Sequence, residues 1–99
     1  MTDKTLQDTL DERGGNYGPF DRHALAAQQL KQIVRAHLAT NKRYNALSIM
    51  SKATVDEGLD MIMHKVARLI NGDPLHDDSW VDIAGYATIT NKFVNEANK

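Results

Sequence analysis

Four carboxylates have the residue types and spacing best suited to chemistry. Asp78 and Asp82 stand near the start of one predicted helix, and Asp56 and Asp60 stand on another. Residues at i and i+4 share a helix face, so each pair presents its oxygens close together. Oxygen ligands suit hard divalent cations, so Mg²⁺ or Mn²⁺ is the expected cofactor. Such a site would use all four as metal ligands, with Asp82 and Asp60 as the catalytic carboxylates.

Asp78 and Asp82 also have a structural explanation. Acids in the first turn of a helix are stabilised by the helix dipole, and aspartate is a good N-cap at the position of Asp78. Asp82 is harder to explain, because it falls inside an apolar arc with Tyr86, Ile89 and Phe93. A carboxylate there is costly unless a cation, a metal or several donors compensate it.

Five other polar residues are candidates for a functional site. Lys65 and Arg68 would meet phosphates beside a metal site, or they are solvated charges of a helix face. Glu57 and His64 fall opposite the apolar stripe of their helix, so the sequence predicts that they face solvent. His37 falls on the inner side of its helix, where a core histidine is expected.

The N-terminal segment, residues 1–19, is predicted to be an irregular arm. Its end is rich in glycine and contains Pro19, so it cannot hold a helix. Arg13, Tyr17 and Gly18 form a compact group that would close over a ligand, with Arg13 and Tyr17 binding substrate, or would serve packing.

Three helices must position these residues. Apolar residues at spacings of three and four predict an all-α fold, a compact bundle whose helices cover residues 21–40, 54–71 and 78–97. Asp21 is expected to cap the first helix, and Thr54 with Glu57 has the capping-box spacing for the second. Residues 41–53 fit either a connector or a short extra helical turn.

Each predicted helix carries an apolar stripe that should form the core. The stripes consist of Ala26, Leu30, Ile33, Val34 and Leu38; then Val55, Leu59, Ile62, Met63, Val66, Leu69 and Ile70; then Trp80, Ile83, Ala84, Ala87 and Val94. Tyr86, Ile89 and Phe93 widen the last stripe beyond what one neighbouring helix needs. They are the expected contact surface for a partner.

Length and composition set further bounds. The 99 residues make one domain, 1–99, and a chain of this size with 41% hydrophobic residues often buries more surface by forming a homo-oligomer. A net charge of −1 argues against a nucleic-acid binder. The absence of cysteine excludes disulfides and thiolate metal sites. No stretch reads as a signal peptide or membrane span, so a cytoplasmic protein without membrane contact is expected.

Most of the chain resembles a group of small phage and prophage proteins. The resemblance is carried by three runs, Glu12–Phe20, His64–Gly72 and Asp77–Ala87. The last run, Asp-Asp-Ser-Trp-Val-Asp-Ile-Ala-Gly-Tyr-Ala, is the most specific. It implies a phage-type protein in the host cytoplasm and no defined activity.

More distantly, the helical pattern resembles the MazG-like all-α nucleoside triphosphate pyrophosphohydrolases. That resemblance implies Mg²⁺ held by a Glu-x-x-Glu pair and a Glu-x-x-Asp pair, with cleavage between the α and β phosphates. Glu57 and Asp60 would stand for the first pair, and Asp82 for the last acid of the second.

The second pair departs from the family pattern. Ser79 stands where the family has a glutamate, and Asp78 lies one position earlier. Asp56, on the inner border of the stripe, is an alternative partner for Asp60. The departures fit a different nucleotide ligand, or a fold that kept its shape and lost its chemistry.

Two functions therefore follow from the sequence. One is a magnesium-dependent protein that binds or hydrolyses a nucleotide, with Lys65 directing phosphate. The other is a non-enzymatic phage protein that grips a host or phage protein through Tyr86, Ile89, Phe93 and the arm. A helix-turn-helix DNA binder is disfavoured by the long connection between the last two helices.

Overall fold

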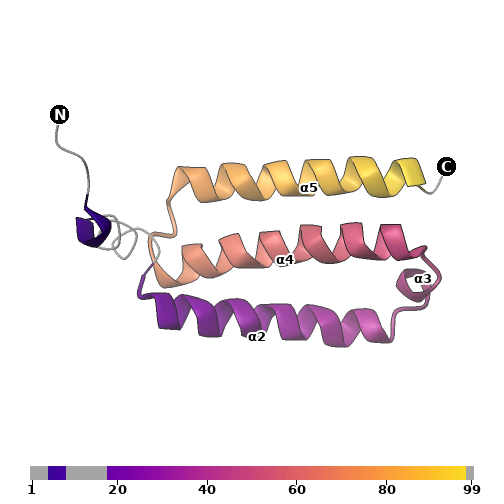
Figure 1. Cartoon of the computed structure of the whole chain (residues 1–99), viewed down its shortest axis with the longest axis horizontal. Coiled ribbons are helices and arrows are strands. Elements are labelled where there is room, and N and C mark those ends of the chain that lie inside the picture. Colours follow the sequence, from indigo (N-terminus) through magenta and orange to yellow (C-terminus); the bar gives the residue numbers. More distant parts are fainter. Residues whose placement is uncertain (1–4, 9–17, 98–99) are drawn as a thin grey trace.

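Three long helices make up most of the described chain. The computed structural model describes residues 5–8 and 18–97, and these contain no strand. The helices are α2 (Phe20–Ala39), α4 (Ile49–Asn71) and α5 (Asp77–Ala97), with a short α3 (Lys42–Asn45) between the first two (Figure 1). A single helical turn occupies residues 6–8. The predicted all-α fold of three main helices is confirmed.

The start of α4 corrects one sequence prediction. The helix begins at Ile49, because the Ser48 hydroxyl accepts a hydrogen bond from the Ser51 backbone N–H at 3.1 Å. Thr54 lies inside the helix and its hydroxyl donates to the Met50 carbonyl at 2.9 Å. The predicted capping box at Thr54 is therefore wrong. Ser48 is an equally good cap six residues earlier, and nothing between them breaks a helix.

The other helix ends were predicted with mixed success. The end of α4 at Asn71 is confirmed, and the Gly72 N–H donates to the Arg68 carbonyl at 3.0 Å. Pro19, and not Asp21, occupies the N-cap position of α2. Asp78 is not a cap either, because α5 already begins at Asp77.

The long helices lie side by side in one layer, with α4 in the middle (Figure 1). Helix α4 packs against α5 on one side and α2 on the other, while α2 and α5 share no extensive contact. The α5 side of α4 is marked by Gly58, against which Thr90 packs. The α2 side is marked by His64, whose ring contacts His23. These two positions lie about 120° apart on the α4 wheel, so α2 and α5 pack on different sides of α4.

The predicted apolar stripes exist, but the chain leaves most of them open. Among the described residues only three hydrophobic side chains are buried: Ala27, Ala67 and Leu69. Residues expected in the core are more than half exposed, at 59% for Ile33, 63% for Ile70 and 54% for Trp80. Most of the other large residues of the stripes are only partly buried.

Two further predictions concern His37 and the membrane. His37, expected in the core, is exposed. No helix in the described part of the chain is long and apolar enough to cross a membrane.

Candidate functional site

An ion pair between the two C-terminal helices forms the centre of the candidate site. The Lys65 Nζ of α4 lies 2.9 Å from Oδ2 of Asp82 in α5. The Lys65 side chain is only 12% exposed, whereas Asp82 is 45% exposed. The hydrogen bond from Lys65 lowers the pKa of the Asp82 carboxyl, which holds it ionised. The compensation that Asp82 needs in its apolar arc is therefore supplied by a cation of the chain itself.

Two histidines lie on the other flank of α4. The rings of His23 in α2 and His64 in α4 meet edge to face, with their centroids 4.6 Å apart. His23 is 6% exposed, and its Nδ1 is buried without a hydrogen-bond partner among the described residues. Burial lowers the pKa of His64 to about 4, and it also lowers the pKa of His23. Both rings are therefore neutral at pH 7.

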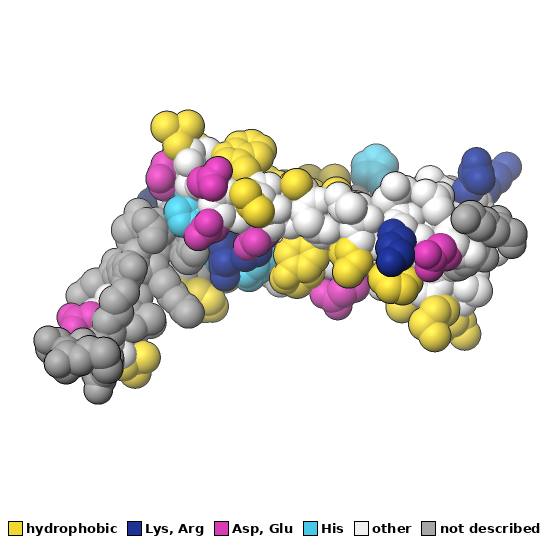
Figure 2. Space-filling model, turned by 90° about the horizontal axis from the view of Figure 1, so that it is seen from above, with side chains coloured by type: hydrophobic (Ala, Val, Ile, Leu, Met, Phe, Trp, Pro, Cys, Tyr) yellow, Lys and Arg dark blue, Asp and Glu magenta, His cyan; other side chains and the backbone are white. Residues whose placement is uncertain are grey.

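Basic side chains add to this polar cluster. The charges of Arg68 and Lys31 lower the pKa of both histidines, and Arg68 also lowers that of Asp82. Lys31, Lys65 and Arg68 are the cations of this cluster, and Asp82 is its carboxylate. In Figure 2, Lys or Arg and histidine side chains lie together toward one end of the molecule, with acidic side chains beside them. We call Lys31, Lys65, Arg68, Asp82, His23 and His64 the basic cluster.

Asp56 and Asp60 belong to a different site. They line a cavity of about 300 Å³ between α2, α3 and α4, together with Arg35 and Tyr44. The Tyr44 hydroxyl donates to the Asp56 carboxylate, at 2.8 Å from Oδ1 and 3.0 Å from Oδ2. This bond raises the pKa of the Tyr44 phenol, because a phenolate could not donate it. Asp56 thereby ties the α3 segment to α4.

Tyr44→Phe should therefore lower the midpoint of urea unfolding, because a hydrogen bond to the charged Asp56 carboxylate is lost. Urea unfolding followed by circular dichroism measures the change. Tyr86→Phe is the matched control, since the Tyr86 hydroxyl makes no hydrogen bond within the described part of the chain. Equal stabilities for the two variants would show that the Tyr44–Asp56 bond contributes nothing.

The four predicted carboxylates do not gather into one centre. Asp56 and Asp60 face α2 and α3, whereas Asp82 is reached from the opposite side of α4 by Lys65. Asp78 lies exposed in the first turn of α5. Within residues 5–8 and 18–97, no group of three or more histidine, aspartate or glutamate side chains is placed to hold a metal ion. The described residues of a single chain therefore do not bring together the four carboxylates that were expected to bind Mg²⁺.

The remaining predicted residues fall into three groups. Glu57 is exposed as expected, but His64 is not on a solvated face, because α2 brings His23 against it. Tyr86, Ile89 and Phe93 line a shallow groove of about 470 Å³ beside Glu57 and Gly58. Arg13 and Tyr17 lie outside the described residues.

Sequence reasoning missed His23 and Lys31. Both lie in a helix whose pattern is dominated by its larger apolar residues. Neither has a spacing to other polar residues that is typical of a ligand site. The available signal was Ala27, one turn after His23, because small residues mark the line where helices touch.

Comparisons with known proteins place the chain in a family without adding an activity. No curated protein and no solved structure matched it. Residues 4–94 match a family described as a domain of unknown function, DUF6378. Because this match spans nearly the whole chain, the protein belongs to the DUF6378 family.

Proposed function

We propose that the protein binds the phosphate groups of a nucleotide at the basic cluster. The supporting observation is that three cations, Lys31, Lys65 and Arg68, lie near His64, beside the Lys65–Asp82 pair. Two neutral histidines beside these cations, His23 buried and His64 partly buried, add ring nitrogens that can donate or accept hydrogen bonds. Such an arrangement attracts an anion and offers directional contacts to its oxygens.

Binding without hydrolysis is the function that this geometry favours. Lys65 and Arg68 would contact phosphate oxygens, and Asp82 would hold Lys65 in place or accept a hydrogen bond from the ligand. Magnesium-dependent hydrolysis stays a prediction of the MazG-like resemblance. No metal-dependent reaction is part of this proposal, because the described residues of a single chain do not bring the four carboxylates together.

Lys65→Gln should weaken binding of ATP about 10-fold to 100-fold, because a hydrogen bond from a charged donor contributes roughly 1.5–3 kcal/mol. Titration calorimetry with ATP, inorganic triphosphate and uncharged adenosine measures the affinity. Triphosphate should bind and adenosine should not. The melting temperature of the unliganded variant checks that it folds.

Lys92→Gln is the matched control, because Lys92 is an exposed lysine of α5 whose Nζ lies 5.7 Å from the Phe93 ring centroid, away from the cluster. Its ATP affinity should equal that of the unchanged protein. If millimolar ATP and triphosphate produce no binding heat and no rise in melting temperature, the proposal is wrong.

A second candidate function is recognition of a host or phage protein. It is favoured by the groove along α4 and α5, where Ile89 and Phe93 are each 52% exposed. The groove is apolar along α5 and has Glu57 at its rim, as a docking site for a helix would. If nucleotides fail to bind, this groove is the remaining candidate.

A further inference from the structure

Large apolar side chains from all three long helices lie on one face of the layer. On α4, the residues that meet α5 (Gly58, Lys65) and α2 (His64) leave a free arc centred near Val66. Ile62, Val66 and Ile70 point along this arc. The opposite arc carries Glu57 and Arg68, at about 180° from Val66 on the wheel.

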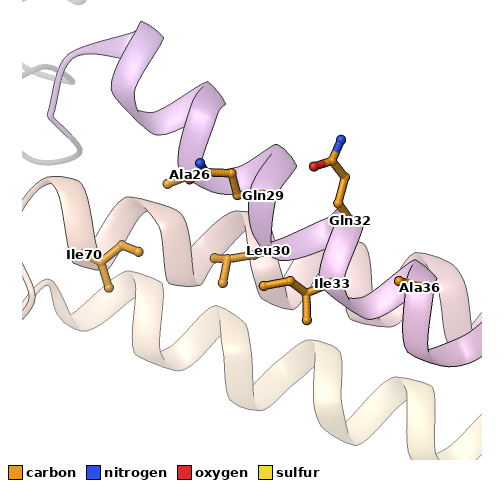
Figure 3. A pocket seen from close by; sticks show the side chains of 7 residues that line it. All are labelled: Ala26, Gln29, Leu30, Gln32, Ile33, Ala36 and Ile70. Carbon is orange, nitrogen blue, oxygen red and sulfur yellow. The ribbon is translucent and has the colours of Figure 1, made fainter.

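Both outer helices contribute to the same apolar face. A hollow of about 570 Å³ is lined by Leu30 and Ile33 of α2 together with Ile70 of α4, which places all three on one side of the layer (Figure 3). On α5, Tyr86 and Phe93 line the groove with Glu57 on the charged side. Ile83 lies on the other flank of the line of contact with α4, beside the apolar arc. We call Leu30, Ile33, Ile62, Val66, Ile70 and Ile83 the apolar face.

We propose that the apolar face is the interface with a second copy of this chain. A domain is normally built of two packed layers around a core, and this chain supplies one layer. Only Ala27, Ala67 and Leu69 are buried apolar residues in the described part, so the chain has half of a core. A second copy placed face to face brings the same stripes together and completes it. This inference does not depend on nucleotide binding.

The area and the charges of this face fit such a dimer. Three helices about 35 Å long and about 9 Å apart offer on the order of 900 Å² per face. A standard stable interface buries about 800 Å² per partner. The six residues of the apolar face carry no charge, whereas the other face holds Glu57, Lys65 and Arg68, whose desolvation in an interface would be costly. The copy therefore covers the apolar face and leaves the basic cluster open.

Cross-linking of single cysteines tests the proposal, because the chain has no cysteine of its own. Ile62→Cys places a thiol near the centre of the apolar face, and Glu57→Cys places one on the opposite face as the matched control. A short bis-maleimide linker should convert most of the Ile62→Cys protein into dimer, with less than one tenth of that yield for Glu57→Cys. The reverse pattern would overturn the proposal in favour of an interface through the α4–α5 groove.

The mass of the unchanged protein provides the second measurement. Sedimentation should give twice the chain mass of 11.1 kDa at micromolar concentration, and the melting temperature should rise with protein concentration. Val66→Glu should raise the dimer dissociation constant at least 100-fold, or unfold the chain if the dimer is obligate. A monomer in sedimentation, with a melting temperature that does not depend on protein concentration and no cross-linked dimer, would overturn the proposal. It would mean that the chain itself covers this face.

Discussion

Gly58→Val should lower the free energy of unfolding by about 3 kcal/mol, because α4 and α5 are too close at this point for a side chain. A Cβ at Gly58 would overlap the Thr90 hydroxyl, and it would stand 2.7 Å from Thr90 Cγ2 and 2.9 Å from Thr90 Cβ. Rotating the threonine cannot relieve the last contact, so the helices must separate. Thermal and urea unfolding at one fixed protein concentration measure the loss.

Gly85→Val is the matched control on α5. A Cβ at Gly85 meets no atom within 4 Å, so valine is accommodated there. Valine is also a slightly better helix former than glycine, which makes a small gain in stability the expected result. If both variants unfold at the same midpoint, α4 and α5 are not in close contact at Gly58, and the position of Lys65 beside Asp82 would need revision.

Helix content could be predicted from the sequence because it is encoded locally. The apolar spacing of three and four located α2, α4 and α5 to within a few residues, except at the start of α4. There the choice lay between two caps of similar quality, Ser48 and Thr54. Only the hydrogen bonds that each hydroxyl makes in the folded chain decide between them.

The facing of the helices could not be predicted in the same way. Periodicity shows which side of a helix is apolar, but it does not show what covers that side. Ile33, Ile70 and Trp80 were therefore predicted as core and are exposed. The true contacts between helices run through Ala27, Gly58 and Ala67, whose small size lets the backbones approach and which carry little hydrophobic signal.

The sequence indicated some residues of the candidate site but not how they come together. Asp82 was predicted to need a compensating cation or metal, but the identity of its partner depended on the register between α4 and α5. That register accompanies the close approach of the two helices at Gly58, and it places Lys65 Nζ 2.9 Å from Asp82 Oδ2. Asp56 and Asp60 were joined to Asp82 in prediction because a helical wheel records angles within one helix, and it cannot show that α4 stands between the two pairs.

The buried histidines should make stability depend on pH between about 6.5 and about 4. The pKa of His64 is about 4 in the folded protein against 6.5 in an ordinary environment, so the unfolded chain binds more protons in this window. Stability is therefore complete above pH 6.5 and is lost as the pH falls toward 4. Full conversion of this shift would give about 3 kcal/mol at 1.36 kcal/mol per pKa unit. Because His64 is only partly buried, we expect a loss of about 1–2 kcal/mol.

Unfolding midpoints measured in urea at pH 7 and at pH 4.5 test this expectation, and His64→Gln should flatten the difference. The charged groups facing the His64 ring are Arg68, Lys31 and Lys65, whose positive charges add to the effect of burial in lowering its pKa. His37→Gln is the control for replacing a histidine, because His37 is exposed. A His64→Gln variant with the full pH dependence would show that His64 stays solvated and that α2 does not press His23 against it. Loss of the dependence would instead locate the acid sensitivity in the contact between α2 and α4, the same contact that holds the basic cluster together.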